Sequence, residues 1–237
     1  MHTLTAIRSA VAVLAFGAAC AQATAVFQQA PDAPARTAWT SHFGIGLGGF
    51  QVMDDFRVNR DATINHVSWR GTYFDNRGGA THAGAPSTET WTVEFWSGNA
   101  AGPLNQLYSQ DYAAADVVLT SRGTQTVGGV TFDLYDFDLD LTLDFDVVHG
   151  QSYWFSVMSK SHSFNPVFSW LSSGGPGNSW QRIFDGNGRV LDSSPRAGNR
   201  AFSLESNPNP VPEPASLALV ACALLAGGVA GQRRNAG

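Results

Sequence analysis

The chain has 237 residues, a formal net charge of −5, 14% charged residues, 25 glycines and 2 cysteines. Its 15 phenylalanines and 7 tryptophans exclude an intrinsically disordered protein, its acidic balance argues against a nucleic-acid partner, and two cysteines are too few for a disulfide scaffold. The length and composition therefore predict one globular domain with further segments at its ends.

The N-terminal segment 1–25 has the features of a secretory signal peptide. Arg8 provides the positive flank of an apolar run over 10–19, and a stretch of small residues follows. The run has no polar face, which argues against an amphipathic helix, and it is too short for a stable membrane anchor. Two A-x-A patterns permit cleavage after Ala23 or after Ala25.

Residues 26–205 are predicted to form an exported all-β domain, an antiparallel β-sandwich or jelly roll. Short segments rich in aromatic and β-branched residues alternate with Gly, Asn, Asp and Pro, and a helical apolar period is missing. The stretch 185–188, Asp-Gly-Asn-Gly, predicts a hairpin turn. The ten expected strands are 51–58, 64–69, 90–96, 117–120, 130–134, 137–147, 152–159, 167–171, 179–184 and 200–204.

This domain is more acidic than the whole chain. Three arginines and one glutamate belong to the end segments, which leaves 11 basic and 18 acidic residues and a net charge of −7. Cys20 and Cys222 also lie in the end segments, so the domain is expected to fold without a disulfide. About 180 residues are enough to bury a core without covalent crosslinks.

Residues 136–147 alternate between polar, mostly acidic, residues and apolar residues. The odd positions hold Phe137, Leu139, Leu141, Leu143, Phe145 and Val147, while most even positions hold aspartate. The parity reverses upstream at Phe132 and Leu134, which predicts a bulge or bend near Tyr135, or two separate strands. Carboxylates on one strand face repel one another, and they favour a cation or an arginine row on the next strand.

Two interpretations of the aspartate row stay open. It is either a solvated acidic face that discourages edge-to-edge aggregation, or a calcium site built from oxygen ligands. The calcium ligands would be Asp138, Asp140, Asp144 and Asp146. No other cofactor is expected, because the six histidines lack a metal-ligand spacing such as H-E-x-x-H.

Two kinds of carbohydrate site are considered for the domain. Sugars stack on exposed aromatic faces, and Trp96, Tyr73 and Trp180 are the candidates for such a surface. Glu89 and Glu94 have the spacing of the outer acids in the E-x-D-x-x-E motif of some glycoside hydrolases, but Trp91 replaces the middle acid. In a regular strand the two glutamates point to opposite faces, so we expect a non-enzymatic domain.

The C-terminal region combines a proline-rich spacer over 206–214, an apolar segment over 215–231 and a basic tail over 232–237. Alternating prolines predict an extended spacer, and 17 uncharged residues form a helix of roughly 25 Å, close to the thickness of a bilayer core. Arg233 and Arg234 keep the tail cytoplasmic, so the preceding domain lies outside. An ordinary membrane anchor behind a proline linker is the alternative.

The tail resembles the PEP-CTERM sorting signal of Gram-negative bacteria. The motif residues are Val211, Pro212, Glu213 and Pro214, followed by the apolar helix and the pair Arg233 and Arg234. The resemblance implies processing by exosortase, an integral-membrane cysteine protease or transpeptidase. The protein would then be anchored transiently in the inner membrane before it reaches the cell surface or the extracellular space.

The domain is similar to the exported β-domain of many PEP-CTERM proteins. The similarity rests on segments 51–56, 64–73, 90–96, 150–155 and 201–204. It implies a β-sandwich of uncharacterised activity, associated with exopolysaccharide or a biofilm matrix, and it supplies no catalytic residue.

Overall fold

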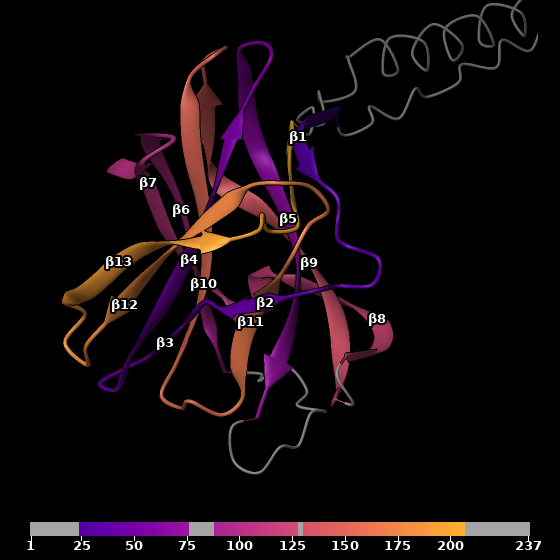
Figure 1. The fold of residues 1–237 in the computed structure, drawn as a ribbon. Helices are drawn as coiled ribbons and strands as arrows, with labels where there is room; N and C mark the ends of the chain where they lie inside the picture. Colours follow the sequence, from indigo (N-terminus) through magenta and orange to yellow (C-terminus); the bar gives the residue numbers. More distant parts are fainter. Residues whose placement is uncertain (1–23, 76–87, 128–129, 207–237) are drawn as a thin grey trace, which may run out of the picture. The chain divides into compact units, whose positions relative to one another are not determined.

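A computed structural model describes residues 24–75, 88–127 and 130–206 (Figure 1). These residues form strands and one short 3-10 helix, η1 (Ala114–Asp116). The all-β class is thereby confirmed. The predicted membrane helix over 215–231 and residues 1–23 of the predicted signal segment lie outside the described residues, whereas its last two residues, Thr24 and Ala25, begin the first strand. Within those ranges, no helix has the length and apolar character needed to cross a membrane.

The described strands form two seven-stranded sheets. In the first sheet β5 is central: one edge pairs with β9, which pairs with β8, and the other edge pairs with β14 at one end and β11 at the other. β1 and β2 extend from β14 and β11 respectively. The strands are β1 (Thr24–Gln29), β2 (Ala38–Thr40), β5 (Ala62–Phe74), β8 (Val118–Val127), β9 (Val130–Val147), β11 (Val167–Leu171) and β14 (Phe202–Ser206).

The second sheet has the order β13-β12-β4-β3-β10-β6-β7, and β4 also pairs directly with β10. The short β3 pairs in parallel with β10, whereas every other pairing between the described strands is antiparallel. The strands are β3 (His42–Gly44), β4 (Gly48–Arg57), β6 (Thr90–Asn99), β7 (Gly102–Ala113), β10 (Ser152–Ser161), β12 (Asn178–Phe184) and β13 (Val190–Ala197).

Aromatic rings from the two sheets pack against each other and form the core. Phe155 of the second sheet lies 5.1 Å from Phe202 of the first, measured between ring centroids, and Trp91 lies 5.2 Å from Trp69. Such ring pairs contribute about 0.5–1.5 kcal/mol each beyond the area that they bury. The two packed sheets have the arrangement of a β-sandwich. Along each strand, residues that face the core alternate with residues on the outer face.

The expected strands correspond to observed ones, and five further strands went unpredicted: β1, β2, β3, β7 and β13. The sequence signal of β7 and β13 is weak because both are edge strands with mostly exposed side chains. The predicted turn over 185–188 is confirmed between β12 and β13. There the Gly188 N–H donates to the Asp185 carbonyl at 3.0 Å, and the Asp185 carboxylate accepts from the Asn187 and Arg189 N–H groups at 2.9 Å.

The expected break into two strands near Tyr135 is wrong, but a register irregularity does lie opposite Tyr135. β8 has one extra residue between the pairs Ser121–Tyr135 and Thr124–Asp133, so the irregularity belongs to β8 and leaves the alternation of β9 unchanged. β9 is one strand of 18 residues, and Tyr135 packs towards the core, as do most of the odd-numbered residues that follow it in the strand. Phe132 and Leu134 instead stay on the outer face, where they line an apolar pocket of about 210 Å³ together with Leu171. Two hydrogen bonds between the Gln125 amide and the Ala35 backbone, at 2.9 and 3.0 Å, hold a loop beside this pocket.

A second register irregularity, in the pairing of β9 with β5, lies further along the strand. Ile64 of β5 is opposite Phe145, whereas His66, two residues later, is opposite Asp140. β9 therefore has three more residues than β5 between these pairs. Leu143 lies in the extra segment and is 63% exposed, although alternation predicts that it is buried. The other odd positions of 137–147 are buried as expected.

Candidate functional site

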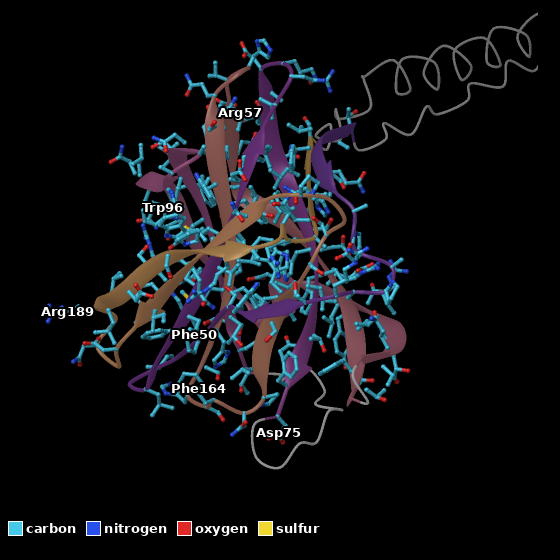
Figure 2. The ribbon with its side chains drawn as sticks, viewed as in Figure 1. Phe50, Arg57, Asp75, Trp96, Phe164 and Arg189 are labelled. Carbon is cyan, nitrogen blue, oxygen red and sulfur yellow. The ribbon has the colours of Figure 1, made fainter. Side chains whose placement is uncertain are left out.

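Three tryptophans and one arginine gather on the outer face of the second sheet, and we call them the tryptophan–arginine cluster. Its members are Trp96 on β6, Trp154 on β10, and Trp180 and Arg182 on β12. Strand alternation places them there, because Phe95 and Phe155, next to them in the chain, belong to the core. Trp96 and Trp154 are register partners, and the ring centroids of Trp154 and Trp180 lie 6.2 Å apart. Figure 2 shows Trp96 at the side of the domain formed by β6 and β7.

The carboxylate of Glu94 orients the Trp96 indole. Glu94 is 9% exposed and accepts hydrogen bonds from four side chains of three strands. The donors are Trp96 Nε1 at 2.9 Å, Gln106 Nε2 at 2.9 Å, Ser109 Oγ at 3.4 Å and Gln51 Nε2. Ser156 of β10 is the register partner of Glu94, and its small side chain leaves room for Gln51 to reach across from β4.

Arg182 stacks on the Trp96 ring, with its Cζ atom 4.2 Å from the ring centroid. Burial lowers the pKa of Arg182, while the charge of nearby Glu94 opposes that change. The guanidinium stays charged at neutral pH because its ordinary pKa is above 12. Among the described residues, Arg182 makes no hydrogen bond and no ion pair within 4 Å, and none of its nitrogens is buried without a partner.

The two other tryptophans are held by close backbone approaches. A Cβ atom on Gly98 would lie 2.3 Å from the Trp154 ring, and one on Gly102 would lie 3.1 Å from the Trp180 ring. Trp154 is 3% exposed and forms the floor of the cluster. The Trp180 Nε1–H donates to Ser193 Oγ of β13 at 2.7 Å, and the ring is partly exposed. Solvent therefore reaches Trp96, Trp180 and Arg182.

The structure separates one predicted stacking residue from the other two. Trp96 and Trp180 belong to the same outer face, whereas Tyr73 is 1% exposed and lies in the core on β5 of the first sheet. Its ring packs against Phe137 and Phe168, so Tyr73 presents no face to a ligand. Trp154 and Arg182 were not predicted from the sequence. The two-residue alternation within 152–159 and 179–184 assigns them to the outer face, but their nearness to Trp96 depends on strand order.

Glu89 and Glu94 point to opposite faces of the second sheet, as alternation predicts. Glu89 is buried between the sheets and accepts a hydrogen bond from the Tyr73 hydroxyl. Burial raises the pKa of Glu89 to about 8, against hydrogen bonds from Tyr73 and Ser159. Glu94 is occupied by its four donors on the other face. The two carboxyl groups therefore do not flank one substrate position, as a glycosidase pair must.

A buried histidine continues the polar contacts near Glu89. His42 Nδ1 lies 2.7 Å from Ser159 Oγ, and His42 Nε2 lies 2.8 Å from the Ser163 carbonyl oxygen. Burial lowers the pKa of His42, although the bond to Ser163 opposes the change. Both His42 and Ser159 are fully buried. Their contacts join the parallel β3 to β10, which is a structural role.

The aspartate row of β9 lies on the outer face of the first sheet, beside basic side chains. Arg70 Nε and Nη2 donate to the Asp136 carboxylate at 2.5 and 2.9 Å, and Arg122 Nε donates at 2.5 Å. Burial raises the pKa of Asp136, but the bonds from Arg70 and Arg122 outweigh it and hold the pKa below its usual range. The three side chains line a shallow pocket of about 160 Å³.

His66 of β5 lies beside the next two aspartates. Its Nδ1 is 2.8 Å from Asp140 Oδ1, and its Nε2 is 3.8 Å from Asp138 Oδ1. The interactions of His66 with the carboxylates of Asp138 and Asp140 outweigh the effect of burial and raise the pKa of His66 to about 9. Within the described ranges, no group of three or more His, Cys, Asp or Glu residues is arranged to hold a metal. The calcium site predicted from Asp138, Asp140, Asp144 and Asp146 stays a prediction.

The predicted sorting residues lie outside the described part of the chain; they are Val211, Pro212, Glu213, Pro214, Arg233 and Arg234. The search of protein-family models, of curated proteins and of solved structures found no match to this chain.

Proposed function

We propose that this protein is exported and then sorted by exosortase to the cell surface or extracellular matrix, where it has a non-enzymatic role. The proposal is supported by the order of the segments: an apolar N-terminal run, a folded β-domain, and a Pro-Glu-Pro tail with a terminal Arg pair. The single observation that carries it is the motif over 211–214, followed directly by an apolar segment over 215–231.

Fractionation of cells with and without exosortase tests this proposal. With exosortase, the protein is expected in the surface or medium fraction without its C-terminal segment; without exosortase, it stays in the inner membrane at full length. Replacing Pro212 and Glu213 with alanine reproduces the second pattern, while Pro208→Ala, outside the motif, is the matched control. A released protein whose mass includes the chain through Gly237 contradicts the proposal.

A second proposed function is binding of carbohydrate by the tryptophan–arginine cluster. The observation that favours it is that Trp96 and Trp180 lie on one outer face and are both partly open to solvent. The guanidinium of Arg182 lies against the Trp96 ring on the same face. Aromatic rings beside hydrogen-bonding side chains are the usual combination in sugar sites. A matrix protein that touches exopolysaccharide through this face would combine both proposed functions.

Affinity electrophoresis in gels that contain the host's exopolysaccharide tests the second function. Wild-type protein is expected to be retarded, and Trp180→Ala to migrate faster in the same gel. Leu143→Ala is a suitable control because Leu143 is exposed on the other sheet. Unretarded migration of the wild-type protein contradicts carbohydrate binding and leaves the sorting proposal intact.

We also infer the jelly-roll form of the sandwich. The chain passes from one sheet to the other at most connections, for example from β4 to β5 and from β5 to β6. Consecutive strands in opposite sheets distinguish a jelly roll from a stack of two meanders.

A further inference from the structure

We propose that Arg182 recognises the carboxylate of an acidic sugar, so that the tryptophan–arginine cluster binds a uronic-acid polysaccharide. This inference rests on the carbohydrate binding proposed above and names the class of sugar. Its basis is a half-buried guanidinium that is held in position by stacking and has its hydrogen-bond donors available to solvent.

Stacking fixes the plane of the guanidinium without using its N–H groups. Arg182 Cζ lies 4.2 Å from the Trp96 ring centroid, so the Trp96 indole orients the cation. The Trp96 ring is itself fixed, because its Nε1–H donates to Glu94. A planar guanidinium oriented in this way pays less conformational entropy when it binds a carboxylate, and its two parallel N–H donors match the two carboxylate oxygens.

Glu94, the acidic residue near Arg182, does not accept hydrogen bonds from the Arg182 guanidinium. Glu94 already accepts from Gln51, Trp96, Gln106 and Ser109, and it makes no ion pair within 4 Å with Arg182 in the described structure. Arg182 therefore differs from Arg70, which uses two donors on Asp136. A half-buried cation without an ion-pair partner favours a ligand that brings its own negative charge.

The neighbouring tryptophan indicates a sugar as the carrier of that charge. Trp180 and Arg182 are two residues apart on β12 and share its outer face, so their side chains stand roughly 6.6 Å apart along the strand. The Trp180 ring is partly exposed and its Nε1–H is tied to Ser193. A uronic acid whose ring stacks on Trp180 is therefore within reach of Arg182 through its carboxylate. The net charge of −7 expected for the domain weakens long-range attraction, but salt at about 0.15 M screens charges beyond about 8 Å.

The test compares acidic polymers with their neutral counterparts. Binding of the purified protein to polygalacturonate and to alginate is measured by isothermal titration at about 0.15 M salt. The same polymers after reduction of their carboxyl groups are the matched neutral ligands. At least one acidic polymer is expected to bind about tenfold more tightly than its reduced form. Equal binding of the two forms overturns the uronate inference and preserves carbohydrate binding; binding of neither form to any polymer overturns both.

Two variants assign the effect to Arg182. Arg182→Gln is expected to bind the acidic polymer no better than the reduced polymer, and Arg182→Lys to lose most of the difference because lysine lacks the two-pronged geometry. Arg189→Gln removes the same charge at the exposed end of the same hairpin (Figure 2) and is expected to bind as the wild type does. An equal loss in Arg189→Gln means that net charge alone is responsible, which overturns the inference.

Polyglutamate separates a sugar from an acidic peptide. The proposal expects wild-type protein to bind polyglutamate at least tenfold more weakly than the acidic polysaccharide, because polyglutamate has no ring to stack on Trp180. Equal affinity for polyglutamate shows recognition of carboxylates regardless of the sugar and contradicts the proposed ligand class. The comparison of acidic and reduced polymers uses wild-type protein only, so it holds even where an Arg182 variant fails to fold.

Discussion

Arg70 on β5 donates two parallel hydrogen bonds to Asp136 on β9, from Nε at 2.5 Å and from Nη2 at 2.9 Å. Arg122 on β8 donates to the same carboxylate, so one aspartate joins three adjacent strands. The aspartate row of β9 is thus partly neutralised by its neighbours in the sheet. This arrangement agrees with the arginine-row interpretation of the acidic pattern.

The first prediction concerns Asp136→Asn. Because the folded pKa of Asp136 lies below its ordinary value of 3.8, the ion pair stabilises the fold above that pH and the contribution is lost as the pH falls through the folded pKa. The variant is expected to lose about 1–2 kcal/mol of unfolding free energy at neutral pH, and much less at acidic pH. Urea unfolding of both proteins across pH measures this. Asp144→Asn, an exposed member of the same row, is the control; equal losses in the two variants contradict the prediction.

The second prediction concerns His66. Its pKa is raised from 6.5 to about 9, so its contribution is complete below pH 6.5 and disappears as the pH rises through about 9. His66→Gln is expected to cost about 1 kcal/mol at low pH and nearly nothing at high pH, a modest amount because Asp140 is largely exposed. NMR titration of the His66 ring measures the pKa directly. A midpoint near 6.5 shows that the aspartates do not stabilise the charged ring.

The third prediction concerns Glu89, whose pKa is raised from 4.5 to about 8. The folded state holds a proton that the unfolded state releases, so the contribution of Glu89 to stability is complete below pH 4.5 and is lost as the pH rises through about 8. Glu89→Gln removes this titration while it keeps an acceptor for the Tyr73 hydroxyl. The variant is therefore expected to lack this component of the pH dependence. The difference in unfolding free energy between the two proteins changes by up to about 5 kcal/mol over this range, because one pKa unit corresponds to about 1.4 kcal/mol. Parallel slopes in the two proteins count against a protonated Glu89.

The fourth prediction rests on the proposed export and distinguishes the two cleavage positions, after Ala23 and after Ala25, of the predicted signal segment. Thr24 is the register partner of Ser206, and Ala25 is the partner of Glu205, so both residues belong to β1. Cleavage after Ala25 removes these two pairs from the edge of the first sheet, whereas cleavage after Ala23 leaves β1 complete. The mature protein is therefore expected to begin at Thr24. N-terminal sequencing of the exported protein measures this, and a start at Val26 contradicts it.

Most of the strands were predictable because apolar and polar side chains alternate along them, and this alternation depends only on neighbouring residues. Phe137 and Leu139 are buried and Asp140 is exposed, as the two-residue period requires. The exception, Leu143, follows from extra residues in β9 relative to β5, a mismatch that neither strand reveals alone. The apolar side chains of Phe132 and Leu134 led to the wrong prediction of a break in β9, again because of a contact that is distant in the sequence. They are apolar because the loop at Ala35 packs beside them, about a hundred positions away in the chain.

The sequence predicted two members of the tryptophan–arginine cluster, Trp96 and Trp180, and missed the other two, Trp154 and Arg182. Alternation alone assigns Trp96, Trp154 and Trp180 to strand faces. Tyr73 has similar chemistry and a similar glycine-rich neighbourhood, yet it is buried because β5 is central in the first sheet and packs against the second. The pairing of Arg182 with Trp96 depends on the order β12-β4-β10-β6, which brings together residues from distant parts of the chain.

Local patterns in the chain were sufficient for the β class and for the inward and outward faces of most strands, because each depends on neighbours within a few residues. Long-range pairing determined which charges meet and which aromatics are buried. The row from Asp136 to Asp146 shows the difference. Its alternation predicts an acidic face, but only the neighbouring strands bring Arg70 and His66 against it, because a carboxylate's energy depends on groups across the sheet.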